Sequence, residues 1–194
     1  MPVPKSVYRV ADSDPEVGVA LQNAISQFRE LGVIIVDVDF EHWKPGPGQR
    51  EDLSGMYCCE KLLKNSSRIF ISEEDYERYG ANWFESARDA PGTSGSEEFL
   101  SMKAQMEHLG HDVERLLDNN HCDILLATSS TDLPLDLGRL PGIQVPLGFY
   151  SADREIVRDS KGMVTKAPNI PYGITLTGRR FSEEKLLACA YTFE

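Results

Sequence analysis

The sequence has few of the features that mark membrane-spanning, secreted or nucleic-acid-binding proteins. No apolar run approaches the roughly 20 residues that a helix needs to cross a bilayer. Met1–Val10 holds no apolar segment long enough for a secretory signal peptide. The 20 lysines and arginines are outnumbered by 31 aspartates and glutamates, which gives a formal net charge of -11. This deficit of cations argues against binding nucleic acid or an anionic membrane surface.

Cysteine is scarce and badly spaced for disulfide pairing. The four cysteines are Cys58, Cys59, Cys122 and Cys189, and no C-x-x-C is present. Adjacent cysteines such as Cys58 and Cys59 make a poor disulfide unit. Four free thiols in a reducing compartment are the simplest interpretation, so we expect a cytoplasmic protein with structural thiols.

The sequence has no complete metal or phosphate motif. His108 and His111 are three residues apart in a predicted helix, but no motif places a third or fourth ligand. A solvated polar face is therefore the favoured interpretation. Gly138 and Gly142 precede a strand and open no helix, so they are not a phosphate-binding loop. We expect no metal and no cofactor.

A serine nucleophile is equally hard to place. No serine lies in a G-x-S-x-G elbow or in a glycine-serine-serine-glycine run. Ser94 lies in "GTSGS", where a hinge is the favoured interpretation. Ser129 and Ser130 lie at the end of a predicted buried strand. No general base can be assigned to activate either serine, so we interpret them as at most part of a pocket wall.

Apolar periodicity predicts helices and strands along most of the chain. The opening residues, with two prolines, are expected to be non-helical. Asp14 as N-cap and Pro15 begin a helix that ends at Gly32, and a buried strand follows over Val33–Phe40. Helices are expected over Glu51–Lys64 and within Ser72–Gly92.

The second half begins with a long helix over Glu97–Asn119, whose Gly110 indicates a bend or a tight contact. Strands are expected at Cys122–Ser130, Ile143–Tyr150 and Tyr172–Arg179. The charged stretch Asp153–Lys166 between the last two is interpreted as a solvated loop.

A final helix is predicted after Ser182, which serves as its N-cap. Phe181 and Leu186 occupy the two positions of a hydrophobic staple. Together these elements predict one α/β domain over residues 1–194, with an open mixed sheet of about four strands and helices packed on it. Such a sheet has exposed edges, which favours association or aggregation.

Three segments resemble the C-terminal part of the amidase signature family, especially its fungal amidases and relatives of the glutamyl-tRNA amidotransferase A subunit. They are "DILLATSS" (Asp123–Ser130), "LPGIQVPLGFY" (Leu140–Tyr150) and "APNIPYGITLTGRRFSEEKLLACAYTFE" (Ala167–Glu194). Their order and spacing match the family's strand, Gly-Tyr-Pro strand and final strand-helix. The resemblance is weaker upstream but covers most of the chain.

The resemblance implies an amide hydrolase that cleaves a carboxamide C–N bond with a serine, a cis-peptide serine and a lysine. In the family these lie N-terminally, near a Gly-Gly-Ser-Ser-Gly-Gly stretch that this sequence lacks. No catalytic residue can therefore be assigned here, and we expect the chain to be inactive alone, as a truncated enzyme or pseudoenzyme.

The resemblance also implies that this part supplies sheet strands and a substrate-pocket wall. The residues we assign to that wall are Trp83, Thr128, Ser129 and Arg139. Two positions depart from the family pattern, because Ala127 replaces a strand-end proline and Arg139 replaces a glycine. A long cation in place of that glycine would block the wall or change what fits against it.

The expected partners follow from these two interpretations. A small amide substrate would bind only if an N-terminal portion were supplied, as a partner chain. The alternative is a non-catalytic protein-binding or self-associating module that reuses the fold, for example as a homo-oligomer.

Overall fold

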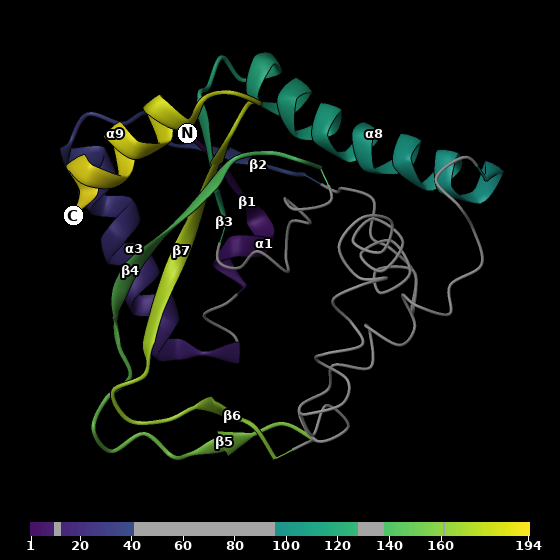
Figure 1. Cartoon of the computed structure of the whole chain (residues 1–194). Helices are drawn as coiled ribbons and strands as arrows, with labels where there is room; N and C mark the ends of the chain where they lie inside the picture. Colours follow the sequence, from purple (N-terminus) through teal and green to yellow (C-terminus); the bar gives the residue numbers. More distant parts are fainter. Residues whose placement is uncertain (10–12, 41–95, 128–137, 161) are drawn as a thin grey trace. The chain divides into compact units, whose positions relative to one another are not determined.

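The computed structural model describes residues 1–9, 13–40, 96–127, 138–160 and 162–194 (Figure 1). They belong to two compact units. The first unit comprises the described residues within Met1–His42, Glu107–Ile156 and Lys166–Glu194, and the second comprises those within Trp43–Met106 and Val157–Thr165. The first holds the sheet and its covering helices. The expectation of one domain over residues 1–194 stays a prediction.

The first unit is built on antiparallel and parallel strand pairs. β3 (Ile124–Ala127), β7 (Pro171–Gly178) and β4 (Gly142–Phe149) form an antiparallel sheet in the order β3-β7-β4. β1 (Pro2–Pro4) pairs in parallel with β2 (Val36–Val38), and β1 lies beside β3. The expected α/β class with mixed strand directions is confirmed.

Two helices cover one face of the β3-β7-β4 sheet (Figure 1). α3 (Pro15–Glu30) and α9 (Glu183–Phe193) share an apolar core with the strands. The rings of Phe28 and Phe193 stack with centroids 4.5 Å apart. The side-chain amide of Gln27 donates a hydrogen bond of 2.8 Å to the Phe193 carbonyl oxygen. These contacts join the two helices directly.

β3 contributes side chains to two cores, one on each face of the sheet, because successive residues of a strand point to opposite faces. Ile124 and Leu126 belong to the core shared with α3 and α9. Leu125 and Ala127 belong to a second core. The other buried members of this second core, from α8 (Glu97–Asn119) and the loops beside the strands, are Val113, Leu117, Cys122 and Leu140. The prediction of a buried strand here is confirmed for β3.

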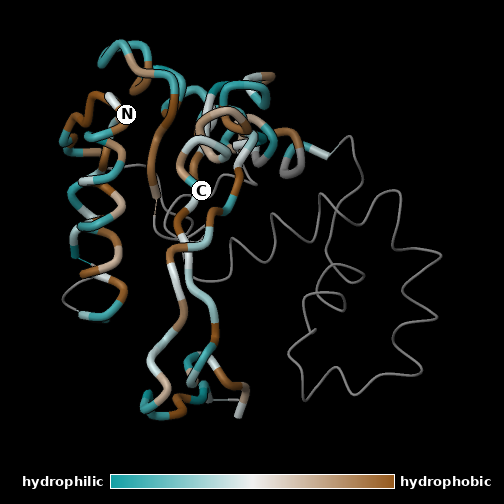
Figure 2. The backbone as a smooth tube through the Cα atoms, turned by 90° about the vertical axis from the view of Figure 1, so that its left-hand side faces the viewer, coloured by the Kyte–Doolittle hydropathy of each residue, from teal (hydrophilic) through white to brown (hydrophobic). Residues whose placement is uncertain are grey.

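The ends of α3 follow the sequence signals closely. Asp14 is the N-cap, Pro15 takes the first helical position, and Gly32 follows the C-cap with a φ of 85°. Glycine adopts this left-handed conformation without steric cost, which is why the helix stops there. Teal and brown segments alternate along α3 in Figure 2, as expected for a helix with one buried side.

The first 40 residues differ from expectation in two ways. The predicted buried strand over Val33–Phe40 is only three residues long, and Ile34 is exposed. The opening residues, expected to be non-helical, form β1 and the single helical turn α1 (Lys5–Tyr8). Pro4 acts as the N-cap of α1, a role in which proline's missing N–H costs nothing.

The predicted staple at the start of α9 is wrong. Phe181 is 93% exposed with a φ of 64°, whereas Leu186 is buried. Ser182 is the N-cap as predicted, but its hydroxyl donates to the Arg179 carbonyl oxygen (2.7 Å) and not to the helix. The turn over Arg179–Ser182 points Phe181 away from the core, which a staple does not allow.

Part of the predicted solvated loop is regular. β5 (Val157–Arg158) and β6 (Val164–Lys166) form a two-stranded hairpin, in which the Thr165 hydroxyl donates to the Val157 carbonyl oxygen at 3.2 Å. Most side chains of the hairpin are exposed, as expected. The helices predicted over Glu51–Lys64 and Ser72–Gly92 lie outside the described residues.

Candidate functional site

Of the four predicted wall residues, only Arg139 is among the described residues. Trp83, Thr128 and Ser129 lie outside them. Arg139 follows the buried Gly138 in the turn before β4, is itself exposed, and has a φ of 53°. This left-handed conformation favours glycine. The departure from the family pattern thus falls where a glycine would fit the backbone better than arginine does.

The turn that carries Arg139 is held against α8. A Cβ added to Gly110 would clash with the Gly138 carbonyl oxygen and with the Arg180 guanidinium. One guanidinium nitrogen of Arg180 binds the Glu114 carboxylate at 2.7 Å, and the other approaches the Gly138 carbonyl oxygen at 3.4 Å. Gly110 therefore provides the close backbone contact predicted from the sequence, and Arg180 bridges helix and turn.

Gly110→Ala is expected to destabilise the protein despite the higher helix propensity of alanine. Propensity alone would give a gain of about 1 kcal/mol. Because the new Cβ would meet the backbone carbonyl of Gly138 as well as the Arg180 side chain, and the backbone cannot easily move, we expect a net loss of about 1–3 kcal/mol in unfolding free energy. Urea unfolding measures it, with the exposed Glu107→Ala as control. A gain in stability would show that helix and turn do not approach so closely.

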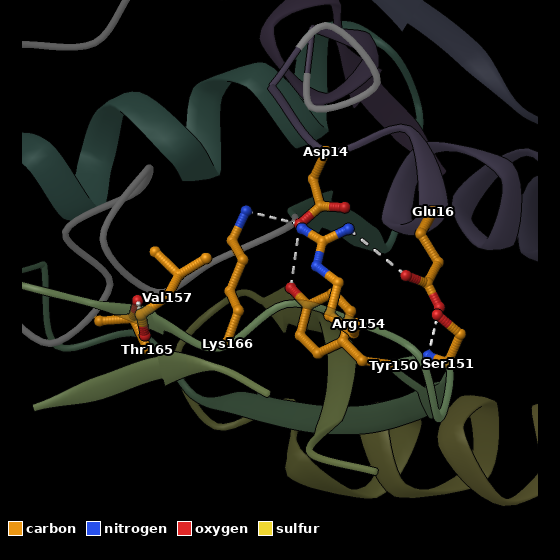
Figure 3. A network of polar contacts seen from close by, with 8 residues as sticks. All are labelled: Asp14, Glu16, Tyr150, Ser151, Arg154, Val157, Thr165 and Lys166. Atoms are coloured by element: carbon orange, nitrogen blue, oxygen red, sulfur yellow. Dashed lines mark hydrogen bonds and ion pairs between the residues drawn. The ribbon is translucent and has the colours of Figure 1, made fainter. Parts of the chain in front are cut away.

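A cluster of polar contacts gathers around the buried Asp14 (Figure 3). The Asp14 side chain is only 5% exposed. Its Oδ2 atom accepts hydrogen bonds from Lys166 Nζ at 2.6 Å, Arg154 Nη2 at 3.1 Å and the Tyr150 hydroxyl at 3.1 Å. The start of α3 is thereby tied to both ends of the segment between β4 and β7.

A second carboxylate completes the Asp14 cluster. Glu16 accepts a hydrogen bond of 2.6 Å from the Ser151 backbone N–H and lies 3.5 Å from Arg154 Nη1. The Arg154 guanidinium also lies over the Tyr150 ring, 4.9 Å from its centroid. Two carboxylates thus face two cations, and the formal charges of the cluster cancel.

The environment fixes the protonation states of the cluster. Burial tends to raise the pKa of Asp14, but hydrogen bonds from Lys166 and Tyr150 and the positive charges of Lys166 and Arg154 lower it overall. Burial, followed by the hydrogen bond to Asp14, raises the pKa of Tyr150 to about 12. At neutral pH, Asp14 is therefore ionised and Tyr150 keeps its proton.

These protonation states suit a structural clamp better than a catalytic group. General acid–base catalysis needs a group that titrates near the working pH. The pKa of Asp14 is lowered and the pKa of Tyr150 is raised, so both are shifted away from neutral pH. Both shifts favour the hydrogen bond from the Tyr150 hydroxyl to the Asp14 carboxylate. The Asp14 cluster can hold the loop after β4 in place, and it presents no activated nucleophile.

The stability contributed by the cluster should depend on pH at both extremes. The folded pKa of Asp14 lies below its ordinary value of 3.8, so its contribution is present above that value and lost as pH falls through the folded pKa. Tyr150 has a folded pKa of about 12, so its contribution is complete below 10 and lost as pH rises through 12.

Urea unfolding of the wild type, Asp14→Asn and Tyr150→Phe across pH measures both contributions. The difference in unfolding free energy between the wild type and Asp14→Asn should shrink in acid, and the difference between the wild type and Tyr150→Phe should shrink above pH about 10. Differences in unfolding free energy that stay constant at every pH would contradict the assigned protonation states.

The Asp14 cluster was missed because its members are remote in sequence. The sequence predicts only an N-cap at Asp14, which makes no side-chain capping hydrogen bond. Arg154 and Lys166 belong to the stretch that the sequence predicts to be a solvated loop. Their bonds to Asp14 span 140 and 152 positions of the chain. No local pattern signals a contact across such a separation.

The histidines and cysteines considered in the sequence form no metal site and no reactive thiol among the described residues. His108 and His111 are exposed and lie near Asp112 and Glu114 at 3.8 Å and 3.3 Å. Within the part of the chain that the structure describes, no three or more histidine, cysteine, aspartate or glutamate side chains are grouped so that they could hold a metal ion. Burial raises the pKa of the Cys189 thiol, which keeps it protonated and unreactive at neutral pH.

Ser94, Ser130, Cys58 and Cys59 lie outside the described residues. No described helix is long and apolar enough to cross a membrane.

Solved structures that share this architecture include proteins named as amidases or amide hydrolases. The whole chain aligns with 39% of a fatty acid amide hydrolase at a TM-score of 0.66 and 15% identity. It aligns with 37% of an amidase family protein from Bacillus anthracis at a TM-score of 0.61 and 15% identity. Identities this low show the fold alone. The chain therefore has the α/β architecture of the amidase-signature fold.

Sequence comparison gives the same relationship independently. The chain is 44% identical over 217 aligned positions to an Arthroderma benhamiae protein also named as an amidase, covering 99% of the chain and 36% of that protein. It is 32% identical over 127 residues to a probable amidase of Arabidopsis thaliana, covering 64% of the chain and 21% of that protein. No protein-family model matches.

The chain is thus related to the amidase-signature family, and the resemblance found in the sequence is confirmed. It spans about a third or less of the length of these two curated relatives.

Proposed function

We propose that the chain is the C-terminal portion of an amidase-signature amide hydrolase. Such an enzyme would cleave the C–N bond of a carboxamide. The observation that carries the proposal is the 44% identity to a fungal protein named as an amidase, which extends over 99% of this chain. In this proposal the chain supplies sheet strands and a wall of the substrate pocket, which the turn at Arg139 helps to form.

Hydrolysis would require residues that another polypeptide segment supplies. The sequence holds no Gly-Gly-Ser-Ser-Gly-Gly stretch, and the Asp14 cluster offers no nucleophile at neutral pH. The chain would therefore bind and hydrolyse a small amide only together with an N-terminal portion. Arg139, on the proposed wall, would narrow the range of amides that fit.

A test is ammonia release by the full chain from small aliphatic and aromatic amides. We expect none from the chain alone, and turnover once the remaining two-thirds of the Arthroderma relative is added as a separate polypeptide. The matched control is the double variant Ser129→Ala with Ser130→Ala. Turnover by the chain alone would contradict the proposal. If the double variant kept this turnover, the nucleophile would lie elsewhere in the chain. If the double variant abolished it, Ser129 or Ser130 would be needed for the reaction.

A second candidate function is a non-catalytic, self-associating module. In the described part of the sheet, β4 pairs with β7 and with no other strand, which leaves one edge open. Pro146 and the irregular register between Pro146 and Gly148 restrict further pairing to the first half of β4. A stable, concentration-dependent dimer in light scattering, without turnover after complementation, would favour this candidate over the enzyme. A monodisperse monomer would count against it.

A further inference from the structure

The outer face of α9 carries an apolar pair between two carboxylates. Glu184, Leu187, Tyr191 and Glu194 are spaced by three, four and three residues, which places them on one side of a helix. All four are exposed, with Leu187 at 59% and Tyr191 at 85%. The opposite side of α9, formed by Leu186, Ala190 and Phe193, is buried in the core. The helix therefore has a second apolar stripe that packs against nothing in the described part.

The charge around this stripe is negative. Neither Glu184 nor Glu194 makes an ion pair with any residue in the described ranges. The last turn of α9 carries no basic residue, although the negative end of the helix dipole lies there. Cations supplied from outside would therefore be attracted by the Glu184 and Glu194 carboxylates, most strongly at the last turn of α9, where the helix dipole adds to the negative charge.

A second copy of the chain fits this face poorly. A pair of identical faces would bring carboxylates near carboxylates, between molecules that each carry a formal net charge of -11. A segment with the opposite charge and the same apolar spacing fits better, because its cations would meet Glu184 and Glu194 while its apolar side chains cover Leu187 and Tyr191.

We propose that the face formed by Glu184, Leu187, Tyr191 and Glu194 docks a basic amphipathic segment of another protein. The segment presents two neighbouring apolar side chains flanked by lysine or arginine. Since the stripe is small, the interaction is weak and strongly dependent on salt. The proposal is independent of catalysis and adds a protein partner to the amide-hydrolase function.

The test uses the full chain and two designed helical peptides. Both carry leucines at positions i and i+4, flanked by lysines in one peptide and by glutamates in the other. Fluorescence anisotropy should show saturable binding of the lysine peptide only, weakened at least tenfold between low salt and 0.5 M salt. The double variant Leu187→Ser with Tyr191→Ser should weaken binding at least tenfold. Val19→Ser, which alters an exposed valine on α3, should leave it unchanged.

Several outcomes would overturn the proposal. Equal binding of the two peptides, or no saturable binding of the lysine peptide, would show that the face has no preference for a basic partner. A dimer in analytical ultracentrifugation that the Leu187 and Tyr191 variant abolishes would assign the face to a second copy. Circular dichroism of each variant confirms that α9 remains folded.

Discussion

Phe28→Ala is expected to lower the free energy of unfolding by about 3–5 kcal/mol. Phe28 is fully buried in α3, and its ring stacks on Phe193 of α9 at a centroid distance of 4.5 Å. Truncation removes buried apolar surface and leaves a cavity where α3, α9 and the sheet meet, because neighbouring side chains collapse only partially into the space. Both helices that cover this face of the sheet lose a contact.

Urea unfolding followed by circular dichroism measures this loss. The matched control is Val19→Ala, since Val19 lies on the same helix but is exposed, and we expect a change within about 0.5 kcal/mol. A small effect at Phe28, close to that at Val19, would contradict the placement of α3 against α9.

Asp14→Ala is expected to be the second most damaging substitution, at about 2–3 kcal/mol. It removes the acceptor shared by Lys166, Arg154 and Tyr150 and leaves two cations without this partner. The loss of one partner from a fully buried ion pair costs about 3–5 kcal/mol. The Arg154 and Lys166 side chains remain 24% and 29% exposed, so solvent reduces the expected cost.

The matched control for Asp14 is Asp39→Ala. Asp39 pairs with Lys5 at 2.8 Å, nearly the distance between Asp14 and Lys166, but both partners are exposed. We expect little change at Asp39, because water replaces the lost interaction. Similar effects at the two positions in urea unfolding would show that the Asp14 cluster is not the clamp described above.

Much of the fold follows from local sequence signals. Pro15 and Gly32 delimit α3, and the bounds of α8 agree with the apolar periodicity. The strands β3, β4 and β7 fall within or close to their predicted ranges. These features depend on backbone preference and on which side of an element is apolar, and both are properties of short stretches of chain.

The misplaced elements have a common physical cause. β1 is three residues long and acquires its strand conformation from pairing with β2, more than thirty positions away. Phe181 has the sequence position of a staple, yet the turn at Arg179–Ser182 is fixed by Arg179 and Arg180, which bind Asp118 and Glu114 of α8. Contacts with distant elements override the local preference in both cases.

The same distinction between local sequence signals and long-range contacts applies to the candidate site. The resemblance alone identified Arg139 as an unusual residue, and the structure adds its left-handed backbone and the contact between Gly110 and Gly138. The Asp14 cluster had no counterpart in the sequence, because charged residues in a stretch such as Asp153–Lys166 are ordinarily solvated. Only folding brings Arg154 and Lys166 to a buried carboxylate.

By itself, the sequence determined the α/β class, the long helix, the relationship to amidases and the absence of the family's serine-rich catalytic stretch. Those properties depend on composition, periodicity and motif, which can be read along the chain. Tertiary structure decided which charges are buried together at Asp14, where two backbones meet at Gly110, and which side of α9 stays exposed. Each of these depends on contacts between residues far apart in the chain, whose burial and electrostatic environment exist only once the elements have packed.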